Sequence, residues 1–241
     1  MNDPHAQLKE AIQNSDNIVF FGGAGVSTES GIPDFRSEDG IYNMKYAYPP
    51  EKILSHSFFM QNTSEFYAFY RDKLLHPNAQ PNKAHYALAE LERQGKLKTI
   101  VTQNVDGLHH KAGSVNVLEL HGSRGRYYCM KCGKEFTMDV VFEAEDVPGC
   151  PCGGMIRPDV VLFEEALDQS VIERSVRAIR EADVLIVGGT SLNVYPAAGL
   201  VQHYDGNKLI LINKSETSYD RYANIVIREP IGETLDAAIK E

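Results

Sequence analysis

Short apolar runs alternate with amphipathic stretches along most of the chain. Short apolar runs bounded by polar or glycine residues are typical of buried parallel strands. The expected strands cover residues 17–21, 97–102, 117–120, 160–163, 184–187 and 209–212. Apolar residues at helical spacing predict helices over residues 4–15, 83–94, 168–182 and 231–240. Strands that alternate with helices predict an α/β fold with a mostly parallel, doubly wound sheet.

Polar or glycine residues follow most of these expected strands. In doubly wound folds, ligands bind beyond the carboxyl ends of the strands. We therefore expect the residues at the strand ends to converge on one crevice. They are Gly22–Gly25, Gln103–Asp106, His121, Thr190–Ser191 and Asn213.

The first strand leads into a glycine turn, Gly22–Gly25, and then into a segment with helix-start character at Ser27–Ser30. Strand, glycine turn and helix start together form the phosphate-binding corner of a dinucleotide fold. The third glycine of the usual fingerprint is absent, and no acidic residue ends a second strand about twenty positions later. The turn therefore argues against a simple dehydrogenase.

The stretch from about residue 37 to 79 is rich in aromatic side chains and loops. Its spacing suggests short helices that cover a cleft. An aromatic stripe of this kind is more often packing than a binding device.

All four cysteines lie in one short stretch, as C-x2-C followed by C-x-C; they are Cys129, Cys132, Cys150 and Cys152. In a secreted chain such cysteines would form disulfides, whereas in a reducing compartment this spacing indicates a four-thiolate zinc site. Four thiolates leave no coordination position for water, so we expect one structural zinc ion.

The chain carries a net charge of −9, from 24 basic and 33 acidic residues. Because nucleic-acid binding draws much of its affinity from Lys and Arg on phosphates, no nucleic-acid partner is expected. No apolar run approaches the roughly 18 to 20 residues that span a bilayer, and the polar start lacks the features of a secretory signal. We expect a cytoplasmic protein, monomeric and without a membrane partner.

Several motifs occur in order: Gly23–Ser27, Gly31–Arg36, Thr102–Asp106, His121–Gly122, the four cysteines, and Gly189–Leu192 followed by Pro196–Ala197. This set resembles the sirtuin family of NAD-dependent protein deacylases, from about residue 10 to the C-terminus. The resemblance implies a discontinuous Rossmann-like NAD-binding domain made of residues 1–36, 80–125 and 158–241. It also implies a small domain made of a helical module, residues 37–79, and a zinc-binding module, residues 126–157.

By resemblance, NAD is the co-substrate. Phe35 would cover the nicotinamide ribose and keep water away, Arg36 would order the phosphates, and Asp106 with the backbone of Val105 would hold the nicotinamide carboxamide. Ile231 would pack near the adenine. The full set of expected NAD contacts is Gly23, Ala24, Gly25, Thr28, Phe35, Arg36, Gln103, Asn104, Val105, Asp106, His121, Gly189, Thr190, Ser191, Asn213 and Ile231.

The expected catalytic residues are His121, Asn104 and Asp106. The family residue that matches His121 is the general base, and a near-neutral pKa suits an imidazole to that role. The implied reaction begins with attack of the acyl oxygen on C1′ of the ribose as nicotinamide leaves. His121 then deprotonates the ribose hydroxyls, so that the 2′-oxygen attacks the imidate carbon. Free lysine, nicotinamide and O-acyl-ADP-ribose are the products.

The resemblance also implies that an acetylated lysine peptide adds as a strand between two edges of the chain. Val160, Val161 and Phe163 would line the acyl-lysine tunnel from one edge, and Asn193 and Val194 belong to the other.

The chain departs from the family in two places. Many relatives carry Trp-Phe-Gly-Glu where this chain has Leu162–Glu165, so a peptide preference cannot be transferred. Relatives that remove succinyl groups carry a helical Tyr-x-x-Arg pair, whereas Arg71 here lies four residues after Tyr67. One position on a helix is a rotation of about 100°, which directs Arg71 elsewhere and favours acetyl or another uncharged acyl group.

Two other classes of protein share part of this pattern. A zinc-knuckle scaffold could bind NAD without turning it over, but the set of His121, Asn104 and Asp106 argues against it. An ADP-ribosyltransferase shares the NAD cleavage step, but the expected tunnel-lining strand favours deacylation.

Overall fold

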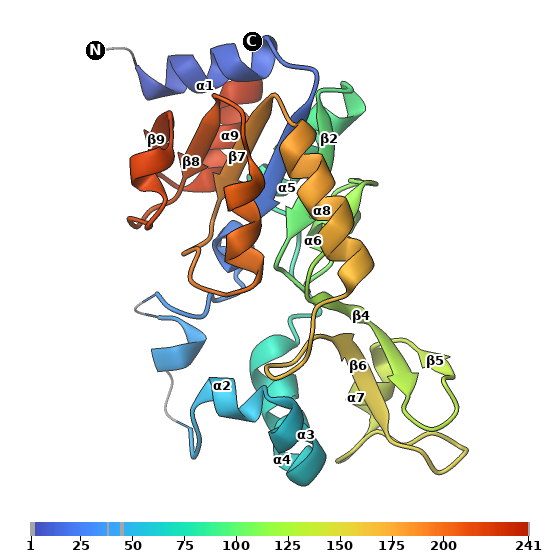
Figure 1. The fold of residues 1–241 in the computed structure, drawn as a ribbon. Coiled ribbons are helices and arrows are strands. Elements are labelled where there is room, and N and C mark those ends of the chain that lie inside the picture. The colour runs from blue at the N-terminus through green and yellow to red at the C-terminus, as the bar shows by residue number, and fades with distance from the viewer. Residues whose placement is uncertain (1–2, 38, 44–45, 241) are drawn as a thin grey trace.

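The computed structural model describes residues 3–37, 39–43 and 46–240. Residues 1–2, 38, 44–45 and 241, which fall within the expected domain ranges, lie outside this description. The chain forms two lobes, an upper one around a parallel sheet and a lower one of short helices and a small sheet (Figure 1). Both ends of the chain lie on the upper lobe.

The large sheet has six strands in the order β3-β2-β1-β7-β8-β9, and every neighbouring pair is parallel. This order places the point where the strand order reverses between β1 and β7, where doubly wound folds bind ligands. The expected doubly wound α/β class is confirmed. The strands are β1 (Ile18–Gly22), β2 (Leu97–Thr102), β3 (Val117–Glu119), β7 (Val184–Gly188), β8 (Leu209–Ile212) and β9 (Ile225–Ile227).

Alternate residues of the strands enter two separate hydrophobic clusters. In β1, Ile18 and Phe20 join one cluster, whereas Val19 and Phe21 join the other. Three helices cover the first face: α1 (Pro4–Gln13), α5 (Lys83–Arg93) and α9 (Ile231–Ile239). The helix α8 (Gln169–Glu181) and the 3-10 helix η5 (Ala197–His203) cover the second. Burial on both faces explains why β1, β7 and β8 are apolar throughout rather than alternating.

Capping side chains and a glycine mark the ends of the longer helices. Asp168 caps α8 by accepting from the backbone of Ser170 and Val171, and Asn82 forms a capping box at the start of α5. Gly95, with φ of 74°, lies just after α5, where a left-handed residue commonly ends a helix. The remaining short elements of the upper lobe are η1 (Ala24–Val26), η2 (Thr28–Ser30), α6 (Leu108–Lys111) and η6 (Asp220–Tyr222).

The lower lobe joins short helices to a three-stranded antiparallel sheet in the order β5-β4-β6. Its core is the aromatic cluster around Phe59, Phe66 and Tyr67, so the expected packing role of these aromatic residues is correct. The elements are η3 (Ile41–Asn43), α2 (Pro50–Ile53), α3 (His56–Gln61), α4 (Thr63–Phe69), the π-helical turn η4 (Tyr70–Leu74), β4 (Gly122–Cys129), β5 (Glu135–Phe136), α7 (Asp139–Glu143) and β6 (Ile156–Val160).

Two expectations about these elements are wrong. The strand expected at residues 160–163 is instead β6, which ends at Val160 and pairs antiparallel with β4, outside the large sheet. The apolar run predicted a longer strand, but residues 161–163 leave β6 and Glu164 adopts a left-handed φ of 76°. The helix start at Ser27–Ser30 yields only the single turn η2, because Gly31 adopts φ of 78° and ends it.

The apolar faces of the helices and strands pack into the hydrophobic clusters of the two lobes. Among the helices of the described residues, none combines the length and the apolar character needed to cross a membrane.

Candidate active site

The loops after β1 and β7 pack directly against each other. The amide of Gly25 donates to the carbonyl of Gly189 across 2.8 Å, and a Cβ built on Gly25 would lie 2.8 Å from the Cα of Gly189. A Cβ on Gly23 would lie 2.8 Å from the Cβ of Thr190. Side chains at Gly23 or Gly25 would therefore force the two loops apart. Ala24 lies between these glycines and is half-buried.

Ser27 joins two residues that the sequence singled out as catalytic. Its hydroxyl donates to Asp106 Oδ2 across 2.6 Å and accepts from the amide nitrogen of Asn104 across 3.1 Å. The other oxygen of Asp106 accepts from the backbone of Leu108 across 2.9 Å. The Ser27 hydroxyl is thus committed to protein contacts, whereas its sequence position suggested a phosphate. Sequence spacing carries no signal for this contact, since 79 residues separate the partners.

His121 is held by the loop after β2. Its Nδ1 lies 2.9 Å from the carbonyl oxygen of Gln103. Because a carbonyl oxygen only accepts, Nδ1 carries a proton and the lone pair of the neutral ring is on Nε2. No group of the described residues forms a hydrogen bond with Nε2. Burial lowers the pKa of His121, and the bond to Gln103 only partly opposes this shift. The ring is therefore a neutral base at pH 7.

Further bonds bring the ends of four strands together. The side-chain amide of Gln103 donates to the hydroxyl of Thr190 across 3.1 Å, which also accepts from the backbone of Leu192. The carbonyl of Val105 accepts from the backbone of Arg124. The loops after β1, β2, β3 and β7 thus form one connected site, as expected from their positions at strand ends.

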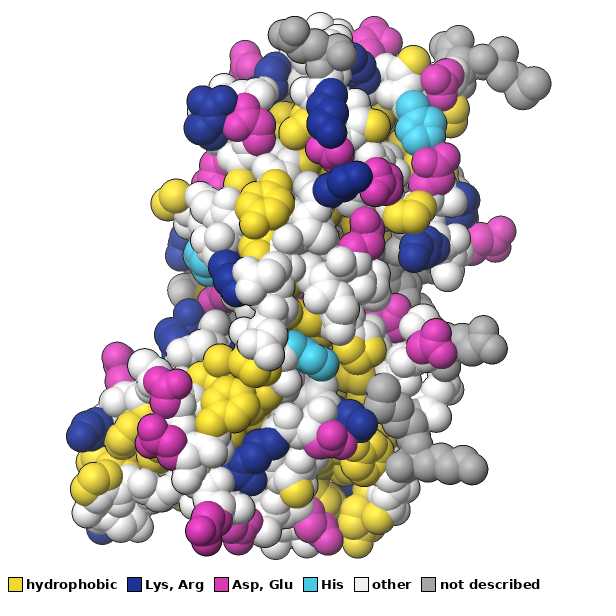
Figure 2. Space-filling view, turned by 180° about the vertical axis from the view of Figure 1, so that it is seen from behind, with side chains coloured by type: hydrophobic (Ala, Val, Ile, Leu, Met, Phe, Trp, Pro, Cys, Tyr) yellow, Lys and Arg dark blue, Asp and Glu magenta, His cyan; other side chains and the backbone are white. Residues whose placement is uncertain are grey.

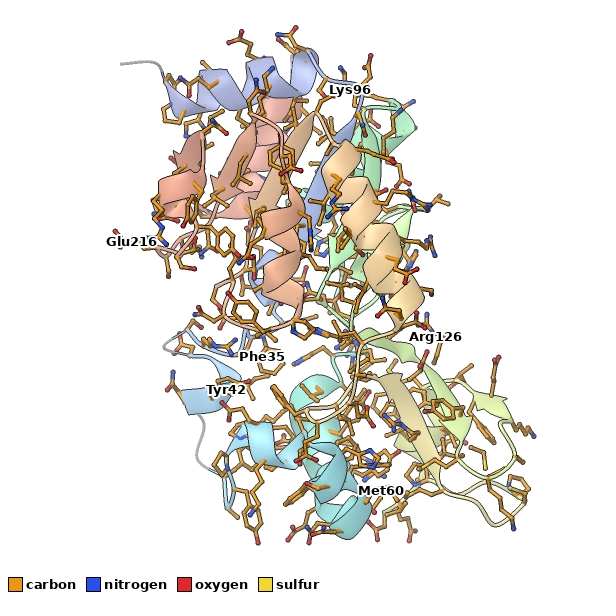
Figure 3. The ribbon with its side chains drawn as sticks, viewed as in Figure 1. Phe35, Tyr42, Met60, Lys96, Arg126 and Glu216 are labelled. Atoms are coloured by element: carbon orange, nitrogen blue, oxygen red, sulfur yellow. The ribbon has the colours of Figure 1, made fainter. Side chains whose placement is uncertain are left out.

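Phe35 lies between the two lobes, next to Tyr42 (Figure 3). The ring of Phe35 is half-buried with its centroid 5.5 Å from that of Tyr42, and the Arg36 guanidinium lies 5.2 Å from the same Tyr42 ring. The carboxylate of Asp34 accepts from the backbone of Arg36 and Ser37 and fixes the turn. Hydrophobic side chains and a histidine also gather between the two lobes on the opposite side of the molecule (Figure 2).

Other expected contact residues lie farther along the sheet edge. The side chain of Asn213 donates to the carbonyl of Ser215, and Ile231 is buried at the start of α9 against Gly188. Thr28 donates its hydroxyl to the carbonyl of Gly25. Ser191 is half-buried. None of these side chains bonds to His121, Asn104 or Asp106 among the described contacts.

The segment expected to contact substrate begins beside His121. The amide of Val161 donates to the carbonyl of His121 across 2.9 Å, and Val160 pairs with Gly122. The Phe163 side chain is 40% exposed, while its backbone pairs with Ser55 of the lower lobe. On the opposite edge, Asn193 is exposed and Val194 half-buried.

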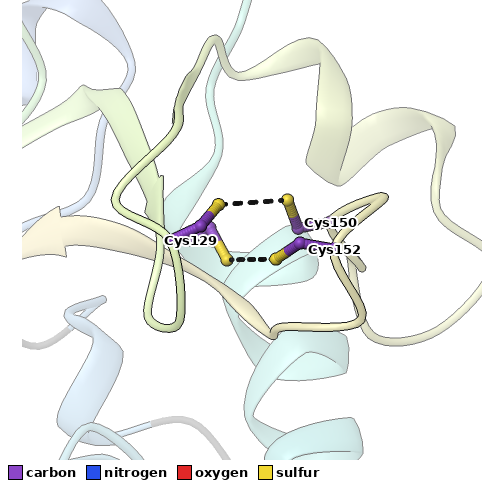
Figure 4. A group of neighbouring side chains, drawn as sticks. Cys129, Cys150 and Cys152 are labelled. Atoms are coloured by element: carbon purple, nitrogen blue, oxygen red, sulfur yellow. Dashed lines mark hydrogen bonds between the residues drawn. The ribbon is translucent and has the colours of Figure 1, made fainter.

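The four cysteines form one cluster in the lower lobe (Figure 4), with all sulfur atoms within 4.8 Å of one another. The Sγ–Sγ distances are 3.5 Å for Cys129–Cys152 and 3.7 Å for Cys132–Cys150. These distances exceed a disulfide bond and match the roughly 3.8 Å edge of a tetrahedron with Zn–S bonds of about 2.3 Å. A Cβ on Gly154 would lie 2.6 Å from Cys129 Sγ, so this glycine lets the chain wrap the cluster. The donor set fits a structural zinc ion.

Comparisons with known proteins agree with this geometry. A family model described as the Sir2 family matches residues 23–196. NAD-dependent protein deacetylases of Clostridium acetobutylicum and Clostridium tetani are 60% and 57% identical, over 97% and 99% of this chain and 97% and 98% of their own. A solved complex of Sir2 with a p53 peptide and NAD+ is 37% identical, covers 97% of this chain and 96% of its own, and has a TM-score of 0.86. The chain belongs to the Sir2 family, the sirtuins.

Proposed function

We propose that this chain is an NAD-dependent protein lysine deacetylase. It transfers the acetyl group of acetyl-lysine to ADP-ribose and releases nicotinamide and O-acetyl-ADP-ribose. The curated relatives named as deacetylases support this activity, as do Sir2 structures that contain a p53 peptide with NAD+ or an acetyl-ADP-ribose. One geometric observation carries the proposal: a neutral imidazole lies among converging strand ends, fixed at Nδ1 and without a hydrogen-bond partner at Nε2 among the described residues.

In this proposal His121 is the general base. The carbonyl of Gln103 orients the ring, so that Nε2 accepts a proton from a ribose hydroxyl. Bound NAD supplies the electrophilic sugar carbon and the oxygen that finally carries the acetyl group. As the imidazole gains its proton, the carbonyl of Gln103 stabilises the new positive charge through Nδ1–H.

Asn104 and Asp106 hold the nicotinamide end of NAD in this proposal. Ser27 fixes both side chains relative to each other, which lowers the entropy cost of ordering them when NAD binds. Phe35 excludes water from the ribose, since a stray water would hydrolyse NAD. The other proposed NAD contacts are the remaining members of the set expected from the resemblance, of which Gly23 is the first in the chain and Ile231 the last.

Acetyl, or another uncharged acyl group, is the proposed cargo. The Arg71 guanidinium donates to the carbonyls of Val141 and Asp146 and lies over the ring of Tyr67. The Tyr67 hydroxyl donates to the carbonyl of Ile156. Both side chains are thus engaged within the lower lobe, and neither supports binding of an acyl carboxylate.

We also propose the division into a discontinuous NAD-binding domain and a small domain made of the helical and zinc modules. Two sheets with separate hydrophobic clusters support this division. The zinc ion would fasten the small domain and take no part in the chemistry, because four thiolates fill its coordination sphere. We further propose a monomer located in the cytoplasm, where thiols stay reduced.

The test combines the purified chain, NAD and an acetyl-lysine peptide, with mass spectrometry of peptide and nucleotide products. We expect one acetyl group lost for each nicotinamide released, formation of O-acetyl-ADP-ribose, and slower turnover of a succinyl-lysine peptide. His121→Ala should remove the activity with the fold intact. A peptide that gains ADP-ribose, or NAD bound without nicotinamide release, would contradict the proposed activity.

A further inference from the structure

The carboxylate of Glu165 accepts four hydrogen bonds. Its Oε1 accepts from Arg157 across 2.8 Å and from His56 Nδ1 across 2.8 Å. Its Oε2 accepts from Arg157 across 2.9 Å and from the backbone of Leu162 across 2.9 Å. Every strong acceptor position of this carboxylate is therefore used.

These bonds connect three separate pieces of the lower lobe. His56 begins α3, Arg157 lies in β6, and Leu162 belongs to the segment that leaves β6. Arg157 is only 9% exposed and also donates to the carbonyl of Val160 across 3.0 Å. Glu165 and Arg157 thus determine the path of the backbone from Val160 to Leu162.

The same stretch of backbone is bonded to the carbonyl of His121 through the amide of Val161. A single chain of contacts therefore runs from Glu165 through residues 160–162 to the residue proposed as the base. A cavity of about 470 Å³ opens beside this chain of contacts, and Val160, Val161, Arg157 and Glu165 lie in its wall.

The four donors around the carboxylate of Glu165 favour its negative charge. Burial raises the pKa of Glu165, but hydrogen bonds from Arg157, the Leu162 backbone and His56 outweigh it and lower that pKa to about 2. The carboxylate is therefore ionised throughout the neutral pH range and can accept all four hydrogen bonds there.

We propose that Glu165 is a positioning residue for the acyl-peptide: it holds residues 160–163, the edge on which the peptide adds as a strand, in register with His121. This inference rests on the proposed deacetylase function. A peptide that adds as a strand gains its affinity from backbone hydrogen bonds, so an edge that is free to move loses affinity for peptide but not for NAD.

The test measures kcat and the Michaelis constants for acetyl-peptide and for NAD in Glu165→Ala and Glu165→Gln. For Glu165→Ala we expect the Michaelis constant for acetyl-peptide to rise about tenfold or more. This is the change in affinity that corresponds to the loss of one hydrogen bond to a charged group. The NAD constant should not change. Glu165→Gln keeps an acceptor for Leu162 and should show a smaller rise.

Glu90→Gln is the matched control, because Glu90 and Arg93 also form a two-bond pair, exposed on α5. It should leave both constants unchanged. An unchanged peptide constant in a folded Glu165→Ala enzyme would overturn the inference, and so would equal rises in both constants. If Glu165→Ala does not fold, the same criteria apply to Glu165→Gln. A wild-type chain without NAD-dependent acetyl loss would instead contradict the proposed function itself.

Discussion

The hydroxyl of Ser27 lies 2.6 Å from the carboxylate of Asp106, and the contact joins the loop after β1 to the loop after β2. Ser27 is almost fully buried, with 1% of its surface exposed. Its second contact, from Asn104, makes it the common partner of two proposed catalytic residues. The contact shows how one small buried hydroxyl can fix two side chains of the site relative to each other.

Ser27→Ala should lower kcat/KM while the fold remains. Loss of a buried hydrogen bond to a charged group costs about 1.5–3 kcal/mol, which corresponds to roughly ten- to a hundredfold in rate. Ser170→Ala is the matched control, since Ser170 donates to Asp168 on the exposed first turn of α8. Equal activity of the two variants, measured by nicotinamide release, would show that the Ser27 contact is not needed.

The activity should persist below the ordinary pKa of histidine. Burial lowers the pKa of His121 from its usual value of 6.5, and the unprotonated ring is the proposed base. As pH falls, kcat/KM should therefore decline only below pH 6.5, when the folded enzyme takes up the proton. A pH–rate profile checks this, and an acidic limb above pH 6.5 would contradict it.

Two buried histidines should make the fold sensitive to acid. His85 and His109 pack with ring centroids 4.8 Å apart, and burial lowers their pKa values to about 4 and about 3. His85 Nε2 and both ring nitrogens of His109 have no partner within the described part of the chain. Each histidine therefore takes up its proton in the unfolded state near pH 6.5 but only near pH 3–4 in the folded state.

The stability contributed by these neutral rings is present above pH 6.5 and is lost as pH falls toward 3. The free energy of unfolding should drop by about 1.4 kcal/mol per pH unit for each histidine in that window. His109→Phe should make the slope shallower by about that amount, measured by urea unfolding between pH 6.5 and 4.5. A slope that matches the wild type would show that His109 does not set this dependence.

Zinc removal should unfold the lower lobe, because Cys129 and Cys150 belong to its hydrophobic cluster. We expect one zinc ion per chain by elemental analysis and a large fall in the melting temperature after chelation. Cobalt in place of zinc should restore the fold with kcat unchanged, since the metal has no open position. A kcat that follows the identity of the metal would indicate a catalytic ion instead.

β1, β7 and β8 could be predicted because each is apolar throughout and is followed by glycine or polar residues. The range of β2 was correct at both ends, Leu97 to Thr102. β9 was missed because Ile225–Ile227 is too short to show a period. The segment after Val160 was assigned to a strand because an apolar run looks the same whether it pairs or turns.

The candidate site could be predicted as a set of residues but not as a set of contacts. Strand ends place His121, Gln103 and Asp106 near one another by topology alone. That Ser27 binds Asp106, or that Glu165 binds His56, depends on side-chain geometry between segments distant in sequence. Glu165 offered no signal of its own, because a Glu in a loop is normally solvated.

A crystal structure with NAD and an acetyl-lysine peptide bound would test the central claim most directly. We predict that His121 Nε2 lies within hydrogen-bond distance of a ribose hydroxyl, with Nδ1 still bonded to the carbonyl of Gln103. An imidazole turned toward bulk solvent, far from the sugar while both substrates are bound, would contradict the account.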